Sequence, residues 1–313
     1  MTAAPRARSC PDFRQSTWDE SLASHVVRRA HDWFAEDLGH ECDWTSVGLV
    51  DAKAEAELPV IARTAGVIAG LPAAGVVVTV ADSRLIWSPR LQDGDRVAAG
   101  AVVATLAGPT RAILSAERVV LNLIGRMSGV ATATRRLVDA VAGTACRVYD
   151  TRKTVPGWRL LDKYATRMGG GWNHRTGLYD AILVKDNHLA ALGAARIDPA
   201  AAVGRARSFV TRAFPPSRAA AMVVEIEVDS LTQLEAVLPM EPDIVLLDNM
   251  EAADLAAGVA LRDAIAPGVV LEASGGIRPE TVTSIAASGV DRVSTGWPTH
   301  HAPWLDVALD WRS

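Results

Sequence analysis

Basic side chains, glycines and a histidine gather in GGGWNHRTGLYDAILVKDNH, residues 169–188. Three glycines precede His174 and Arg175, a short apolar segment follows, and Lys185 comes directly after that segment. Cations at both ends of a buried segment are suited to holding an anion, because a guanidinium pairs with a carboxylate through two parallel hydrogen bonds. The stretch therefore predicts a site for a small substrate that carries several negative charges.

The positive charge of the chain is concentrated near this stretch. Residues 152–175 hold six basic residues and one acidic residue, whereas the whole chain has a net charge of −4. A local positive zone in an acidic protein suits a small anion and does not indicate a nucleic-acid partner. Residues at predicted loop ends are the better ligand candidates, namely Arg152, Lys153, His174 and Arg175. Three others repeat along one predicted helix and are interpreted as a solvated face: Arg159, Lys163 and Arg167.

Short apolar segments alternate with helical patterns from residue 146 onward. Such alternation is typical of a parallel sheet with helical crossovers. Six units with short spacing favour an α/β barrel that is incomplete, with about six strands, in which the catalytic mouth lies at the carboxyl ends of the strands. The predicted strands cover residues 146–150, 181–184, 222–228, 243–247, 269–273 and 292–295.

Polar residues or glycines occur at all six predicted strand ends. Ser274, Gly275 and Gly276 follow the penultimate strand and predict a phosphate site, because glycine lets backbone N–H groups approach an anion. A helix predicted to begin near Pro279 would add its positive end. The other strand-end residues are Arg152 and Lys153, Lys185, Glu227, Asp248, and Gly296 with His300 shortly after it.

The acidic residues Glu227 and Asp248 stand out in a zone that is otherwise suited to anions. They could hold Mg²⁺ bound to a pyrophosphate, or a ribose hydroxyl. Alternatively, they could pair with Lys153 or Lys185 and balance charge. Glu225 lies two residues before Glu227 on a predicted strand, so both side chains are expected to point the same way.

The first half of the chain shows a different pattern. Residues 58–110 contain short apolar runs broken by glycine, proline and Asp-Gly, which is typical of strands and turns. Residues 75–81 are one of these runs and are predicted to form a strand. Helices are predicted over 18–38, 115–141 and 156–169, with Pro156 in the first turn of the last helix and Gly169 at its end.

The composition argues against a secreted protein, a membrane protein and a carrier of a biotinyl or lipoyl group. The three cysteines, Cys10, Cys42 and Cys146, have no C-x-x-C spacing, which fits a reducing, cytoplasmic compartment. No apolar run approaches the roughly 20 residues of a membrane helix, and the first residues do not read as a secretory signal. DGDRVAAG resembles the turns of biotinyl or lipoyl carriers, but residues 54–152 contain no lysine that could carry the group.

The order of several motifs resembles the quinolinate phosphoribosyltransferase family, from about residue 30 almost to the end. The motifs are CDWTS, ARTAGVIAGLP, SAERVVLNLIGRMSGVAT, DTRKTVPG, GGGWNHRTGLYDAILVKDNH, VEIEV, LLDNM, EASGGI and VSTGWPTHHAP. The resemblance implies an N-terminal α/β sandwich domain, placed at residues 1–120 with 301–313, and the barrel at 121–300. It also implies a homodimer, or a higher assembly of dimers, with active sites shared between subunits.

The resemblance further implies an enzyme of NAD biosynthesis. It would transfer a phosphoribosyl group from phosphoribosyl pyrophosphate to quinolinate with decarboxylation, giving nicotinate mononucleotide, pyrophosphate and CO₂, with Mg²⁺ as cofactor. Arg118 would reach the partner's site, and quinolinate would be held by Arg152, His174, Arg175 and Lys185. Phosphoribosyl pyrophosphate and its magnesium would contact the catalytic residues Lys153, Lys185, Glu227 and Asp248. Phosphate would bind Ser274, Gly275, Gly276, Gly296 and His300.

Some positions differ from the usual family pattern. They are Val155, Met168 and Trp297-Pro298, and FPPSR at 214–218 is interpreted as an inserted loop. Two alternatives remain beside the main reading: a related phosphoribosyltransferase that uses another acceptor base, and a homologue that senses quinolinate without catalysis.

Overall fold

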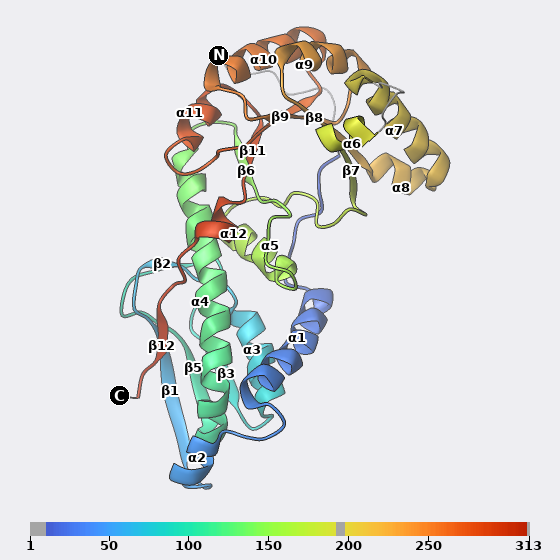
Figure 1. Ribbon diagram of the computed structural model, residues 1–313. Helices are drawn as coiled ribbons and strands as arrows, with labels where there is room; N and C mark the ends of the chain where they lie inside the picture. Colours follow the sequence, from blue (N-terminus) through green and yellow to red (C-terminus); the bar gives the residue numbers. More distant parts are fainter. Residues whose placement is uncertain (1–10, 192–197, 312–313) are drawn as a thin grey trace. The chain divides into compact units, whose positions relative to one another are not determined.

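The computed structural model describes residues 11–191 and 198–311, which form two compact units (Figure 1). We call residues 1–15, 136–153 and 171–297 the barrel unit, and residues 16–135, 154–170 and 298–313 the sandwich unit. This division differs from the predicted boundaries at 120 and 300. Helix α4 (Thr110–Ala140) runs without a break through residue 120 and also through residues 135 and 136, where this division passes from one unit to the other.

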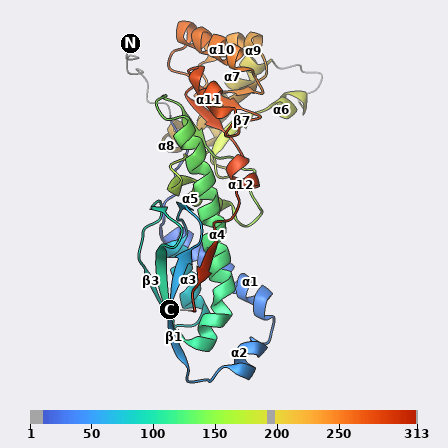
Figure 2. The same cartoon turned by 90° about the vertical axis from the view of Figure 1, so that its left-hand side faces the viewer.

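The sandwich unit is built on a four-stranded antiparallel sheet with the order β12-β1-β5-β3 (Figure 2). Its helices pack onto the sheet around one hydrophobic core. The strands are β1 (Glu55–Ala62), β3 (Ile86–Pro89), β5 (Val102–Pro109) and β12 (Val307–Leu309), and β2 (Gly66–Val67) pairs separately with β4 (Arg96–Val97). The helices are α1 (Glu20–Leu38), α2 (Trp44–Leu49), α3 (Leu71–Ala81), α4, α5 (Arg159–Met168) and α12 (Trp297–His301), which begins one residue before this unit.

Residues 75–81 lie in helix α3, so the prediction of strand structure there is wrong. A short apolar run cannot be assigned to strand or helix by periodicity, and here tertiary contacts decide. The two carboxylate oxygens of Asp93 accept the backbone N–H groups of Gly70 and Leu71, at 2.8 and 2.9 Å, where the helix begins. This remote cap satisfies N–H groups that a helix leaves open at its first turn.

The barrel unit contains six parallel strands in the order β6-β11-β10-β9-β8-β7. Each predicted strand is confirmed to within one or two residues. Consecutive strands β6 and β7 form the two edges of the sheet, and within the described residues no ladder joins them, which confirms the incomplete barrel. The strands are β6 (Arg147–Tyr149), β7 (Ala181–Val184), β8 (Val223–Val228), β9 (Ile244–Asp248), β10 (Val270–Ser274) and β11 (Arg292–Ser294).

Helices of the barrel unit follow the strands and arch around one side of the sheet (Figure 1). Their bounds are α6 (Asp186–Ala191), α7 (Pro199–Ala213), α8 (Pro216–Ala221), α9 (Leu231–Val237) with a 3₁₀ turn at Leu238–Met240, α10 (Ala252–Ile265) and α11 (Val282–Ala287). The predicted loop at 214–218 is wrong from Pro216 onward, where α8 begins. The helix predicted near Pro279 begins three residues later, at Val282.

Alternate residues of each barrel strand face opposite layers. Val224, Ile226 and Val228 belong to the hydrophobic core on the helix side. Val223 belongs to a separate small cluster with Ala181 and Ile244, the first residues of the neighbouring strands β7 and β9, on the inner side of the sheet. Because strand side chains alternate, Glu225 and Glu227 share this inner side, as predicted.

Helix α5 departs from its prediction at its first turn and along one face. It begins at Arg159, three residues after Pro156, whereas Gly169 caps its end as predicted. The side chain of Lys163 is buried, and those of Arg159 and Arg167 are half-buried. The interpretation of these three cations as a solvated face is therefore wrong, because none of the three side chains is exposed and that of Lys163 is buried.

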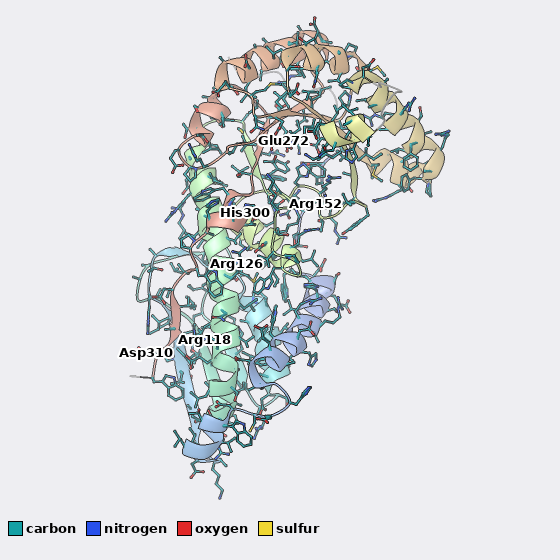
Figure 3. All side chains as sticks on the ribbon, viewed as in Figure 1. Arg118, Arg126, Arg152, Glu272, His300 and Asp310 are labelled. Atoms are coloured by element: carbon teal, nitrogen blue, oxygen red, sulfur yellow. The ribbon has the colours of Figure 1, made fainter. Side chains whose placement is uncertain are left out.

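A buried ion pair joins α4 to α5 in the sandwich unit. Arg126 lies 3.1 Å from Asp162, whose side chain is 1% exposed, and also donates to the carbonyl of Thr299 (Figure 3). Removing one partner leaves an uncompensated buried charge, so Arg126→Met should lower the free energy of unfolding by about 3–5 kcal/mol. Urea unfolding measures this change.

The matched control for that prediction is Arg29→Met. Arg29 and Asp32 form a solvent-exposed pair at 3.0 Å in the same unit. Removing an exposed pair costs at most about 1 kcal/mol. Equal losses for the two variants would show that burial of the Asp162 carboxylate does not set the cost.

Candidate active site

The carboxyl ends of the barrel strands bring predicted site residues to one edge of the sheet. Ser274 at the end of β10 lies opposite Asp248 of β9 and Ser294 of β11. Glu227 lies one strand further, opposite Leu246. Lys185, directly after β7, places its ammonium against the Glu227 carboxylate. The charge-balancing alternative considered for Glu227 is therefore confirmed for its pairing with Lys185.

Two arginines of the barrel unit, Arg152 and Arg175, act on one another through their charges. The Arg175 side chain is buried and donates to the carbonyl of Ala181 at 3.4 Å. Burial, and then the positive charge of Arg152, lower the pKa of Arg175. The Nε of Arg152 is buried and has no hydrogen-bond partner among the residues that the structure describes (Figure 3). Two like charges and an unsatisfied donor are conditions that a bound carboxylate would relieve.

The loop that carries Arg175 is tied to strand β6. Trp172 forms an isolated parallel bridge with Tyr149, and its N–H and carbonyl bond to the backbones of Val148 and Asp150. The buried Asp150 carboxylate accepts the side-chain amide of Asn173 at 2.7 Å and the backbone N–H of His174 at 2.8 Å. Residues 172–174 thus act as a short extension of the open sheet edge.

His174 lies inside the barrel unit against two buried carboxylates. Its Nε2 is 3.2 Å from Glu225 and 3.5 Å from Glu272, and its Nδ1 accepts the N–H of Arg175 at 2.8 Å. Arg292 lies 3.4 Å from the other oxygen of Glu272. Both ring nitrogens therefore already have partners within the unit, so binding of quinolinate by His174 stays a prediction.

Glu272 and Arg292 were not identified as site residues from the sequence. Each occupies an inward position of an apolar strand, and Glu272 stands two residues before Ser274. The sequence does hold a sign of Glu272: two residues apart on a strand, Glu272 and Ser274 are expected to point to the same side of the sheet. The barrel interior is consequently polar beneath the mouth, where small α/β barrels usually place branched apolar side chains.

His174, Glu225 and Glu272 have the composition of a metal site and lie close enough together for one. The hydrogen bonds of the imidazole argue against it. When Nδ1 accepts a backbone N–H, a neutral ring carries its proton on Nε2, and a cationic ring carries one there as well. In either state Nε2 carries a proton and has no lone pair for a metal, and Glu225 lies 3.2 Å from it.

The two carboxylates also set the protonation of the ring. Burial lowers the pKa of His174, but Glu225 and Glu272 outweigh burial and raise it to about 9. The bond from the Arg175 N–H opposes this rise, because only an unprotonated Nδ1 can accept it. We expect the two full charges to prevail, and Glu272→Gln should lower the His174 pKa by roughly one unit or more.

Histidine ring signals followed by NMR against pH measure this shift. Assignment of His174 by its loss in His174→Gln makes the comparison direct. An unchanged His174 pKa in Glu272→Gln would show that Glu272 does not act on the ring.

The turn after β10 is packed against the end of β9. Gly275 has φ of +93°, and a Cβ there would lie 2.0 Å from Oδ1 of Asn249. The N–H of Asn249 donates to the Ser274 carbonyl at 2.9 Å, so the two strand ends hold one another. Gly276 has φ of +60° and open space around it. The turn requires glycine at 275, and it leaves room beside 276 for an anion.

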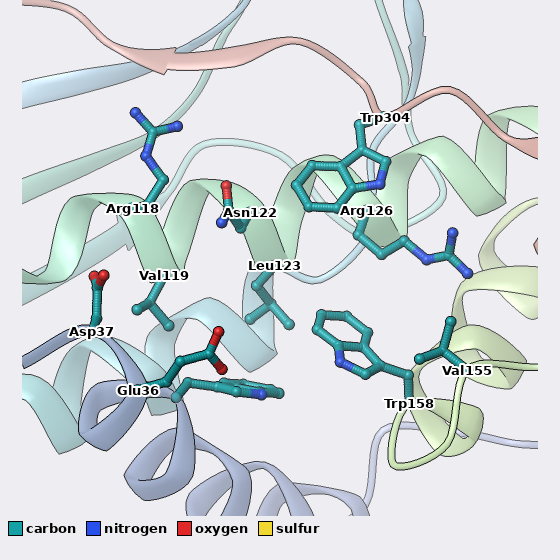
Figure 4. A pocket seen from close by; sticks show the side chains of 11 residues that line it. Glu36, Asp37, Arg118, Val119, Asn122, Leu123, Arg126, Val155, Trp158 and Trp304 are labelled. Atoms are coloured by element: carbon teal, nitrogen blue, oxygen red, sulfur yellow. The ribbon is translucent and has the colours of Figure 1, made fainter. Parts of the chain in front are cut away.

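Two of the predicted site residues, Arg118 and His300, belong to the sandwich unit. Both are exposed. Arg118 on α4 borders a cavity of about 370 Å³ (Figure 4). Tryptophans from three segments line it, together with acidic residues of α1; the lining residues are Trp33, Glu36, Asp37, Arg118, Val119, Asn122, Leu123, Arg126, Val155, Trp158 and Trp304. The catalytic roles of Arg118 and His300 stay predictions.

The remaining predicted residues follow the barrel strands. Lys153 is exposed beyond β6, and Gly296 follows β11. Trp297 packs against the helix-side core of the barrel unit, and its N–H donates to Thr295 Oγ1 at 3.1 Å. Its bulk is therefore used in packing beside the predicted phosphate loop.

The described residues contain no helix long and apolar enough to cross a membrane. Cys42 and Cys146 are free thiols, and Cys10 lies outside the described residues.

Known proteins resemble the chain along most of its length. Residues 43–128 match the N-terminal domain, and residues 130–310 the C-terminal domain, of quinolinate phosphoribosyl transferase. The nicotinate-nucleotide pyrophosphorylase [carboxylating] of Mycobacterium leprae is 42% identical over 92% of this chain and 96% of its own length. A probable enzyme of the same name from Synechocystis is 38% identical over 88% of this chain and 89% of its own length. The solved nicotinate-nucleotide pyrophosphorylase of Francisella tularensis has a TM-score of 0.85 at 34% identity, over 96% of this chain and 99% of that one. The chain belongs to the quinolinate phosphoribosyl transferase family.

Proposed function

We propose that the barrel mouth binds quinolinate beside phosphoribosyl pyrophosphate and transfers the phosphoribosyl group with decarboxylation. The observation that carries this proposal is the buried Arg175 beside the half-buried Arg152, whose Nε has no partner among the described residues, in the same unit as the glycine turn at 275. Relatives that span most of the chain are named for this reaction, which belongs to NAD biosynthesis. The chain is a nicotinate-nucleotide diphosphorylase of the carboxylating type.

Quinolinate carries two carboxylates, and in this proposal they meet the guanidinium groups of Arg152 and Arg175. Lys185 adds a third cation, and His174 supports the backbone of Arg175. Phosphoribosyl pyrophosphate would lie across the neighbouring strand ends, with its 5′-phosphate at Ser274, Gly275, Gly276 and Gly296 and its pyrophosphate towards Lys153. Bringing so many anions together requires this countercharge, because their repulsion is strong outside bulk water.

Mg²⁺ fits the acidic residues of the mouth. Glu227 and Asp248 sit on adjacent strands, and among described residues they gather no third ligand into a closed cage. One or two carboxylates with substrate phosphates and waters are the usual magnesium environment. Bound there, the ion would neutralise charge on the pyrophosphate.

In the proposed reaction the pyridine nitrogen bonds to C1 of the ribose as the bond to pyrophosphate breaks. The pyridinium that results accepts the electron pair released when the C2 carboxylate leaves as CO₂, and a proton takes its place. Arg152 and Arg175 orient the ring, and Lys185, freed from Glu227 by the incoming substrate, offsets negative charge. Positioning and fixed charge carry most of the catalysis.

A turnover assay tests the proposal. Purified protein with quinolinate, phosphoribosyl pyrophosphate and Mg²⁺ should release CO₂ and form nicotinate mononucleotide, and a chelator should abolish turnover. Nicotinate and other pyridine bases serve as controls. Turnover of another base but not of quinolinate would favour a related phosphoribosyltransferase, and binding without pyrophosphate release would favour a sensing homologue.

We also propose a dimer in which Arg118 enters the partner's site, with a cytoplasmic location. Arg118→Ala and Lys185→Ala should each be nearly inactive. Mixed under conditions where subunits exchange, they should regain about a quarter of normal activity, because half of the dimers would be hybrids with one intact site. Failure to regain activity when exchange is demonstrated would count against a shared site.

A further inference from the structure

An N-terminal segment enters the inner side of the barrel unit. We call residues 12–15 the N-terminal plug. Phe13 of this segment is only 6% exposed, although it lies far from the barrel strands in the sequence. Its ring belongs to the small inner cluster formed by the first residues of β7, β8 and β9 (Ala181, Val223 and Ile244) and by Tyr149, the last residue of β6.

Asp12 anchors the plug to two side chains of the barrel. One oxygen accepts the hydroxyl of Tyr149 at 2.7 Å, and the other lies 3.1 Å from Nη1 of Arg292. The Arg292 guanidinium is 4% exposed and stands over the rings of both Phe13 and Tyr149. A buried cation requires partners, and the plug supplies one of the carboxylates that Arg292 contacts.

The plug also contacts the loop that carries the predicted quinolinate residues. The rings of Phe13 and His174 are stacked, with centroids 4.2 Å apart and an interplanar angle of 28°. The Gln15 side chain accepts the Asn173 N–H at 2.8 Å and donates to the Asn173 carbonyl at 3.1 Å. Asn173 and His174 are thus held from one side by the plug and from the other by Asp150.

We propose that the N-terminal plug is a positioning element of the quinolinate site, in which Phe13 and Gln15 hold residues 173–175 so that Arg175 meets the substrate carboxylate. The proposal rests on the proposed function. The plug residues themselves touch no substrate. Residues 173–175 lie beyond the Trp172 bridge, where no ladder formed by the described residues holds them, so side-chain contacts must fix their geometry. Precise placement of binding groups depends on such supporting contacts.

Two variants test the proposal, Phe13→Ala and Gln15→Ala. Each should raise the KM for quinolinate by about tenfold and leave the KM for phosphoribosyl pyrophosphate within about twofold. Phe13→Leu keeps apolar volume without the ring and should recover part of the loss. Gln15 is half-buried and polar, so Gln15→Ala keeps the test valid if Phe13→Ala does not fold.

A matched control separates positioning from stability. Val203 on α7 is fully buried in the helix-side core of the same unit. Val203→Ala should lower the Tm, as a cavity in the core does, and leave the KM for quinolinate unchanged. A merely structural plug would instead make Phe13→Ala behave like this control.

Binding of quinolinate by calorimetry completes the test. Weaker binding in both plug variants, with the unaltered chain binding normally, supports the proposal. Equal quinolinate affinity and equal KM in folded variants overturn the proposal while leaving the proposed function intact. If the unaltered chain neither binds nor turns over quinolinate, the proposed function and the positioning role of the plug are both wrong, because the plug is proposed to position the site for that ligand.

Discussion

Arg175→Ala should lower kcat/KM for quinolinate by about a hundredfold to a thousandfold. The Arg175 guanidinium is buried next to that of Arg152, so a carboxylate bound there would be held away from water. Truncating one partner of a buried, charge-assisted pair costs about 2–5 kcal/mol, or roughly 30-fold to several thousandfold, and the expected loss lies in the middle of that interval. Steady-state kinetics with quinolinate varied at saturating phosphoribosyl pyrophosphate measure the effect.

Two further variants refine this prediction. Arg175→Lys keeps a positive charge but loses the planar fork, so it should remain well below the unaltered protein. Arg278→Ala removes an exposed arginine of the same unit, paired with Glu280 at 3.6 Å, and should not change the kinetics. Normal catalytic efficiency in Arg175→Ala, with the fold intact by circular dichroism, would remove Arg175 from the site.

Gly275→Ala should lower kcat/KM for phosphoribosyl pyrophosphate by at least about a hundredfold. The added Cβ would lie 2.0 Å from Oδ1 of Asn249, and φ of +93° is unfavourable for alanine. Strain of this kind costs about 1–3 kcal/mol, and the displaced turn would also lose the backbone N–H groups aimed at phosphate. Kinetics with phosphoribosyl pyrophosphate varied give the size of the loss.

Gly143→Ala is the matched control for the glycine turn. Gly143 has φ of +88°, a Cβ added there would meet no described atom within 4 Å, and the residue lies outside the predicted site. The substitution should lower stability slightly through φ alone and leave the kinetics unchanged. Comparable loss of phosphoribosyl pyrophosphate use in both variants would show that backbone strain, not the turn's position, explains the effect.

The barrel strands and the residues at their ends could be predicted from the sequence. Alternation of short apolar segments with helices fixes the sheet type, and in a parallel sheet all strand ends of one kind meet at one edge. Lys185, Glu227, Asp248 and Ser274 follow from that rule alone, without any knowledge of side-chain contacts.

Other features depend on contacts that sequence spacing does not carry. The helix over residues 75–81 is set by the distant cap of Asp93, and the burial of Lys163 by the way α5 packs. The stacking of Phe13 on His174 joins segments about 160 residues apart, and no local pattern marks Phe13 as part of a site. Pairings across such separations require the folded chain.

A crystal structure with quinolinate bound tests the central claim most directly. The account predicts the pyridine ring at the carboxyl ends of β6 and β7, with its carboxylates within hydrogen-bond distance of Arg152 and Arg175 and its nitrogen facing the turn at Gly275. Quinolinate bound elsewhere, with both arginines turned away from it, would contradict the account.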